Sequence, residues 1–217
     1  MGKHGKHRPL VMRSAALALG LGLALAAPAE ADTGGQALAQ AAQAQVGVTV
    51  IYDPSYQGLA FPGGDIPRAR GVCTDVVIRA LRDAWGVDLQ LAVNRDMKAA
   101  FGAYPNIWGL STTDRNIDHR RVPNLETLLQ RVGAVRTLSD DPSDYQPGDI
   151  VSYRLNGSNL PHIGVVSAAR SADGQRPLIT HNIGRGTRTE DILFEHQMIM
   201  HARLDAGARA ALQRLME

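Results

Sequence analysis

The sequence predicts an α+β domain in which helices come first along the chain and a meander of antiparallel strands follows. Apolar residues recur at helical spacing within residues 73–133. Beyond residue 136, short runs of strand-forming residues alternate with turn residues. The sequence after residue 31 holds no repeat, low-complexity tract or linker. We therefore expect N-terminal helices packed on an antiparallel β-sheet.

The beginning of the chain is predicted to be a leader. Residues 1–13 are basic, residues 15–27 form an uncharged apolar run, and residues 29–31 (Ala-Glu-Ala) fit a signal-peptidase site. A run of 13 residues is too short to cross a bilayer of about 30 Å. We expect residues 1–31 to be a signal peptide cut before Asp32, and the protein to be exported, periplasmic or secreted, without stable membrane insertion. An uncleaved anchor helix is the alternative.

Charge and composition limit the classes of function. The 217 residues include 23 Lys and Arg, 21 Asp and Glu, and 44% hydrophobic residues. Without residues 1–31, 19 basic and 20 acidic residues remain. The sequence pI of 8.9 therefore comes mostly from the leader, and no nucleic-acid partner is expected. The composition excludes disordered, collagenous and disulfide-rich classes.

The helical part begins with a lead-in at residues 32–51, and the main domain is expected at residues 52–217. The best-defined helix starts at Cys73, with Thr74 and Asp75 in its first turn and Gly86 after its end. The other expected elements of this part are a helix at 33–45, an extended segment at 46–52, a surface loop at 53–71, a helix at 94–101, and a helix with Asn124 as its N-cap that ends at 133.

The second part is predicted to form strands joined by turns. Asn156-Gly157 and Asp173-Gly174 mark two of the turns. The expected strands cover residues 149–155, 163–168, 178–183 and 198–204, and a short exposed helix is expected at 205–215.

Cys73 is the first candidate for chemistry. It is the single cysteine of the chain, although exported proteins usually pair their cysteines. At a helix start, the sulfur lies near free backbone N–H groups and the positive end of the helix dipole, and both favour a thiolate nucleophile. The alternatives are a small buried core residue and an intermolecular bridge.

Two histidines can supply the base that a thiol nucleophile needs. His162 and His181 lie on adjacent predicted strands, and antiparallel pairing can bring them side by side. One would transfer protons and the other would orient it. Asn182 competes with His181 for the orienting role, because a shift of one residue moves a side chain to the other face of a strand.

These motifs resemble the NlpC-type cysteine peptidases of the papain-like clan. The resemblance rests on the order of a cysteine at a helix start, residues 147–151 (PGDIV), residues 162–165 (HIGV), and a strand with Thr180 and His181. Residues 71–79, 116–121 and 181–184 more narrowly resemble the bacterial uncharacterised-domain family numbered 1287. The likeness covers about residues 52–204.

The resemblance implies a papain-like cysteine hydrolase at residues 52–217. Cys73 would be the nucleophile, His162 the general base and acid, and His181 the residue that orients His162. NlpC-type enzymes mostly cut amide bonds in the peptide stems of bacterial cell walls, so peptidoglycan or a related peptide is the expected partner. An acyltransferase using the same triad and a non-catalytic cell-wall binding module are the alternatives.

Other polar residues are secondary candidates. The backbone N–H of Cys73 and Tyr56 are candidates for the oxyanion hole. Asp75 lies beside the nucleophile, and His119 and Arg120 belong to a polar segment that could clamp substrate carboxylates or form a solvated loop. Histidines and carboxylates are numerous, but HExxH and paired CxxC spacings do not occur, so neither a metal nor another cofactor is expected.

Overall fold

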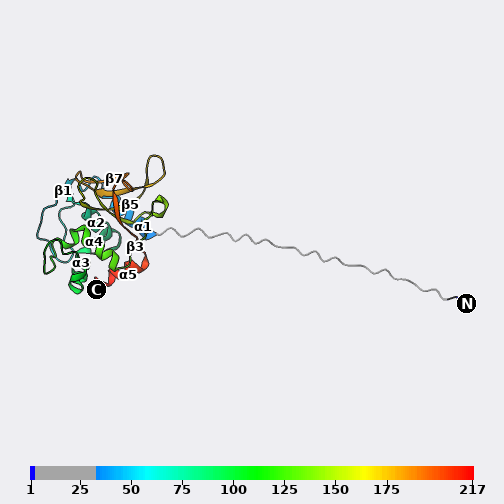
Figure 1. The fold of residues 1–217 in the computed structure, drawn as a ribbon, viewed down its shortest axis with the longest axis horizontal. Coiled ribbons are helices and arrows are strands. Elements are labelled where there is room, and N and C mark those ends of the chain that lie inside the picture. The colour runs from blue at the N-terminus through cyan, green and yellow to red at the C-terminus, as the bar shows by residue number, and fades with distance from the viewer. Residues whose placement is uncertain (3–32) are drawn as a thin grey trace. The chain divides into compact units, whose positions relative to one another are not determined.

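A six-stranded antiparallel sheet organises the computed structural model, which describes residues 1–2 and 33–217 (Figure 1). The predicted signal peptide lies outside the described residues except for its first two. The strand order is β3-β8-β4-β5-β6-β7. The strands are β3 (Val135–Arg136), β4 (Ile150–Arg154), β5 (Pro161–Arg170), β6 (Pro177–Asn182), β7 (Thr187–Glu190) and β8 (Gln197–Ala202). A separate parallel pair joins β1 (Ile51–Tyr52) to β2 (Arg70–Gly71).

Five α-helices accompany this sheet within the described part of the chain. They are α1 (Thr33–Gln43), α2 (Cys73–Trp85), α3 (Leu89–Ala99), α4 (Val122–Arg131) and α5 (Ala206–Arg214). Short 3-10 turns are η1 (Phe101–Ala103), η2 (Asp118–Arg120) and η3 (Pro142–Asp144). The predicted α+β class, with helices packed on an antiparallel sheet, is confirmed.

The core lies on both faces of the sheet. Helix residues such as Leu38, Leu81 and Leu128 pack against Ile163 and Val165 of β5. A smaller cluster on other strand positions, with Val166 and Ile179, packs against Leu193. Because neighbouring strand residues point to opposite faces, His162, Gly164 and Val166 lie on the face away from the helices. The expected lead-in belongs to the same compact unit, Asp32–Glu217, because α1 contributes to the main core.

Helix α2 begins at Cys73 and ends before Gly86, as predicted. The second predicted helix was placed too late, since α3 begins at Leu89, where the Asp88 carboxylate caps the N–H groups of Gln90 and Leu91. The prediction of Asn124 as an N-cap is wrong. Helix α4 begins at Val122, and the buried Asn124 amide donates to the carbonyl of Asp118.

The extended segment predicted at 46–52 is mostly turn, and only β1 is a strand there. Strands β2, β3 and β7 were not predicted, because each is four residues or shorter. No described helix is both long and apolar enough to cross a membrane.

Candidate functional site

The start of α2 is held by a buried ion pair. The Asp75 carboxylate accepts a hydrogen bond of 2.7 Å from the Val72 N–H. The guanidinium of Arg120 binds the same carboxylate at 2.9 and 3.0 Å, and also donates to the carbonyls of Asp53 and Ser55. Loss of one partner of a buried pair leaves an uncompensated charge. Asp75 and Arg120 therefore fix the approach to Cys73.

The prediction of a substrate clamp at His119 and Arg120 is corrected by this arrangement. The Arg120 guanidinium is already paired with the Asp75 carboxylate, and both side chains are almost fully buried. His119 is 2% exposed, and burial, followed by the charges of Arg120 and Arg82, lowers its pKa to about 3. In the sequence the polar run reads as exposed, but η2 packs against α2, α3 and α4.

Cys73 itself is buried, with 7% of its surface exposed. Backbone N–H groups of Ile163, Thr74 and Cys73 donate toward its sulfur and favour the thiolate. Burial outweighs them and raises the pKa of the thiol to about 11. The expectation of a resting thiolate is therefore wrong, because desolvation opposes the helix terminus and is the larger effect.

The two predicted histidines contact each other on neighbouring strands. His162 Nε2 lies 2.9 Å from His181 Nδ1, and the two rings are nearly perpendicular at 81°. Both side chains are almost fully buried. His162 directly precedes Ile163, whose N–H faces the Cys73 sulfur. The structure thus joins His162 to His181 and places the Cys73 sulfur at the backbone of the residue that follows His162.

Gly164 makes room for the histidine pair. A Cβ atom at this position would lie 2.6 Å from a side-chain carbon of Ile179 and 3.2 Å from the Cβ of His181. In the register of β5 and β6, Gly164 continues opposite His181. A side chain here would push β6 away, so the glycine after His162-Ile163 is a requirement of the site.

Glu190 extends the histidine pair to a row of three polar side chains, His162, His181 and Glu190. Its Oε2 lies 3.0 Å from His181 Nε2, and its side chain is 35% exposed while that of His181 is 1% exposed. The oxygen lies off the direction of the ring N–H, so this nitrogen lacks a hydrogen bond of standard geometry among the described residues. The contact is a close approach of the carboxylate to an uncharged ring. Glu190 was not predicted from the sequence, because β7 carries no chemical motif.

Burial keeps both histidines neutral. It is the main cause that lowers the pKa of His162 to about 3, followed by repulsion from His181 and His196. Burial also lowers the pKa of His181, although the Glu190 carboxylate opposes this effect. The resting site therefore contains a thiol and two uncharged imidazoles.

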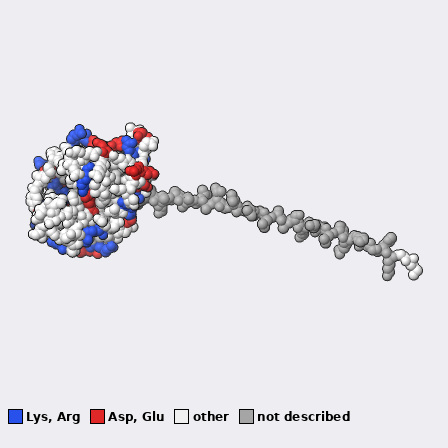
Figure 2. Space-filling model, viewed as in Figure 1, with Lys and Arg blue, Asp and Glu red and all other residues white. Residues whose placement is uncertain are grey.

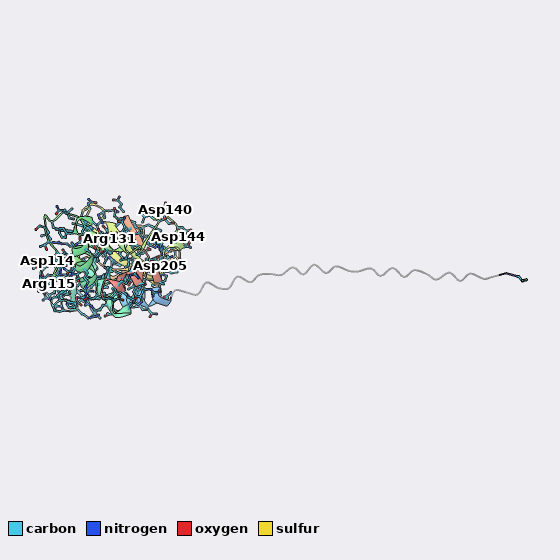
Figure 3. The ribbon with its side chains drawn as sticks, turned by 90° about the horizontal axis from the view of Figure 1, so that it is seen from below. Asp114, Arg115, Arg131, Asp140, Asp144 and Asp205 are labelled. Atoms are coloured by element: carbon cyan, nitrogen blue, oxygen red, sulfur yellow. The ribbon has the colours of Figure 1, made fainter. Side chains whose placement is uncertain are left out.

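Tyr52, not Tyr56, is the tyrosine beside the nucleophile. Burial, followed by electrostatic interaction with the side chains of Cys73 and Asp75, raises the pKa of Tyr52. The hydroxyl of Tyr56 instead lies 3.1 Å from an Asp114 carboxylate oxygen and accepts from the Asn116 amide. Figure 3 shows Asp114 on the side of the domain opposite to Asp140 and Asp144.

Asn182 supports the site from the other face of β6. Its amide donates to the Gly71 carbonyl at 3.0 Å, and its carbonyl oxygen accepts from the Gly184 N–H. Of the two residues considered for the orienting role, His181 contacts His162, and Asn182 holds the segment that leads to Cys73. Within residues 33–217, no three His, Cys, Asp or Glu side chains gather as a metal site requires.

Comparisons with known proteins give a family without an assigned activity. The profile of "Domain of unknown function (DUF1287)" matches residues 39–204. The chain is similar to the "Uncharacterized protein YijF" of Escherichia coli (strain K12), with 55% identity over 162 residues that cover 75% of this chain and 78% of that protein. No solved structure matches the chain.

Proposed function

This chain belongs to the DUF1287 family, and we propose that it is an exported cysteine hydrolase of the papain-like, NlpC-type clan that cleaves amide bonds in peptidoglycan stem peptides. The observation that carries this proposal is the 2.9 Å contact between His162 and His181, next to the Ile163 N–H that donates toward the Cys73 sulfur. A nucleophile, a base and an orienting group are the parts that acyl transfer needs. The compartment and substrate follow from the leader and the resemblance.

Glu190 favours one arrangement of protons in this row. Beside the carboxylate, His181 carries its proton on Nε2, so its Nδ1 is a bare acceptor. His162 must then donate from Nε2 across the 2.9 Å contact. This leaves His162 Nδ1 without a proton, and a neutral nitrogen is what a general base requires.

The proposed reaction starts from the neutral thiol. The Cys73 proton moves to His162 Nδ1 while the sulfur attacks the amide carbonyl carbon. His162 then gives that proton to the amine nitrogen as the C–N bond breaks and a thioester remains. Water loses a proton to His162 and attacks the thioester carbonyl, the C–S bond breaks, and the thiol regains its proton.

A non-catalytic cell-wall binding module of the same fold is the rival function. The observation in its favour is the buried thiol, whose pKa of about 11 is the opposite of the depressed value of most reactive cysteines. In the hydrolase, substrate binding must lower the cost of moving the proton from Cys73 to His162. In the module, the thiol never ionises.

Digestion of purified cell-wall sacculi tests the proposal. The protein from Asp32 onward is incubated with sacculi beside its Cys73→Ala and His162→Ala variants, and soluble products are identified by mass spectrometry. The hydrolase predicts amide-cleaved fragments from the wild type alone, with all three proteins folded by circular dichroism. Equal products from the Cys73→Ala variant, or no products from a wild type with a reduced thiol, would contradict it.

A further inference from the structure

A cavity of about 450 Å³ lies next to the proposed site. One wall is the turn at residues 46–50 and the other is the strand β7 with the turn before it. Glu190, which contacts His181, belongs to this lining. The cavity therefore adjoins the histidine pair through a shared residue, and Figure 1 shows β1 and β7 at the same end of the domain.

Two arginines in this lining are exposed and unpaired. Within residues 33–217, no hydrogen bond or ion pair holds the guanidinium of Arg185 or Arg188. Arg176, which directly precedes β6, is by contrast paired with Asp191 at 2.6 Å. On the face shown in Figure 2, basic and acidic side chains are intermixed. Two neighbouring arginines without an acidic partner are therefore a local feature that protein contacts do not explain.

The backbone that carries these arginines is firmly attached. The Thr187 N–H donates to the Thr49 carbonyl at 2.7 Å. Gly186 has a φ of +81°, and a Cβ atom there would lie 2.7 Å from the Thr49 oxygen. Only glycine allows this close approach. Arg185 and Arg188 thus flank Gly186 and Thr187, both of which lie against Thr49. The backbone positions of the two arginines are therefore fixed relative to the proposed site.

The register places Arg188 on the face of the histidines. Arg188 is the β-ladder partner of His181, and directly opposed residues of antiparallel strands share a face. The turn opposite contributes the exposed apolar side chains of Val46 and Val50. Guanidinium groups bind carboxylates through paired hydrogen bonds, and small apolar side chains can pack on the valines. A short acidic peptide combines both features.

We propose that Arg185 and Arg188 form a subsite for a carboxylate of the peptide substrate, in the cavity between residues 46–50 and β7. The subsite rests on the proposed hydrolase function and names the substrate as a peptide with a free carboxylate near the scissile amide. Its occupant would lie beside Glu190 and His181 without displacing either. The arginines select the substrate and take no part in proton transfer.

Binding to the Cys73→Ala variant tests the subsite without hydrolysis. A synthetic stem peptide with free carboxylates, and the same peptide with its carboxylates amidated, are titrated by calorimetry at low and moderate salt. In this background Arg185→Gln and Arg188→Gln should each raise the Kd for the acidic peptide about three- to tenfold, the range of a typical net hydrogen bond, because both arginines are exposed. The amidated peptide should bind more weakly to the parent and be insensitive to both substitutions.

Arg214→Gln is the matched control. Arg214 is exposed at the end of α5, which lies at the opposite end of the domain from β7 in Figure 1. It should leave the Kd unchanged. Equal affinity for the acidic and amidated peptides, the same loss in the Arg214→Gln variant, or equally strong binding of inorganic phosphate would overturn the subsite. Arginine-dependent binding with no cleavage by the wild type would support the subsite and contradict the hydrolase.

Discussion

The sheet carries two buried histidine clusters that differ in their charge. On β5 and β6, His162 and His181 contact each other, and the nearest carboxylate, Glu190, is partly exposed. On β8, His201 Nε2 lies 2.7 Å from a carboxylate oxygen of Asp149 that is itself buried. The first cluster is a row of neutral rings, and the second is built on a buried charge.

Several hydrogen-bond donors surround the Asp149 carboxylate. Arg203 binds both carboxylate oxygens at 2.7 and 2.8 Å, and the Gln146 N–H donates at 2.8 Å. Burial raises the pKa of Asp149, but these bonds and the one from His201 outweigh it, so the pKa is lowered overall. The ring of Tyr145 covers His201 at 4.4 Å. This cluster connects the turn before β4 to β8 and has the character of a structural support.

The two clusters show what a buried histidine needs for each role. A structural histidine can be locked by a full negative charge, because its proton never has to move. A base must keep one nitrogen free and must return its proton, so a neutral neighbour with a weaker, partly solvated carboxylate behind it is suitable. Stability should therefore depend mostly on the Asp149 cluster, and turnover on the His162 pair.

The largest expected effect is a loss of stability, which should be greater for a substitution in the Asp149 cluster than for one at His162. Asp149→Ala leaves Arg203 and His201 without their shared carboxylate, and breaking a buried pair costs about 3–5 kcal/mol. His162→Ala, which removes no charge partner, should cost about 1–2 kcal/mol, within the usual range for single substitutions. Urea unfolding followed by circular dichroism measures both.

The same variants separate the clusters by activity. At a temperature where both remain folded, Asp149→Ala should retain turnover of stem peptide and His162→Ala should have none. A His162→Ala protein that loses the greater share of stability and keeps its activity would reverse the assigned roles.

An effect of intermediate size is expected in the dependence of folding stability on pH. His119 and His162 have folded-state pKa values of about 3, while unfolded histidine titrates near 6.5. The unfolded state therefore binds more protons below pH 6.5, and stability falls as the pH decreases from 6.5 toward 3, by up to about 1.4 kcal/mol per pH unit for each histidine. Asp149, whose folded pKa is lowered, contributes stability above its unfolded value of 3.8 that is lost only at lower pH.

Urea unfolding at pH 7, 6, 5 and 4 checks this order. His162→Gln should reduce the slope of stability against pH by about one proton between pH 6 and 4. A slope that is flat until pH 4 in the wild type would mean that His162 is not held neutral by burial.

The smallest expected effect is at Glu190. Glu190→Gln keeps an oxygen near His181 but removes the charge that favours the Nε2–H form, so kcat should fall about tenfold, a part of the roughly 10²–10⁴-fold that acid–base catalysis contributes. KM should change little, and stability should change by less than about 1 kcal/mol because the side chain is partly exposed. Histidine ¹⁵N spectra should show a loss of the Nε2–H tautomer of His181.

Asp191→Asn is the control for Glu190. It removes the same charge one residue further along, where the carboxylate pairs with Arg176. It should leave kcat and the histidine spectra unchanged. A Glu190→Gln protein with wild-type kcat and an unaltered His181 tautomer would remove Glu190 from the row.

The sequence was sufficient to predict the parts of the site that have local signals. The helix start at Cys73 and the strands carrying His162 and His181 follow from periodicity and turn residues, and pairing of those strands explains the histidine contact. Glu190 and Tyr52 could not be identified, because their positions depend on how short strands pack. The thiolate expectation failed because a helix terminus is a local effect, whereas the burial that raises the pKa of Cys73 depends on the whole fold.

The role of Arg120 shows the same limit. In the sequence it belongs to a run of four charged or polar residues, which is typical of a solvated loop or a ligand clamp. In the fold, its guanidinium lies in the interior against Asp75. Charge in a sequence indicates that a partner is needed, but it does not tell whether the partner is solvent, substrate or another side chain.

Trapping the acyl-enzyme tests the central claim most directly. The wild type is mixed with a stem peptide, quenched in acid within milliseconds to seconds, and analysed by intact-mass spectrometry and peptide mapping. Because Cys73 is the single cysteine of the chain, a thioester can form at one residue only. The hydrolase predicts a transient adduct on Cys73 with the mass of the acyl fragment, absent from the Cys73→Ala variant. Cleaved peptide together with an acyl adduct on another residue would contradict it.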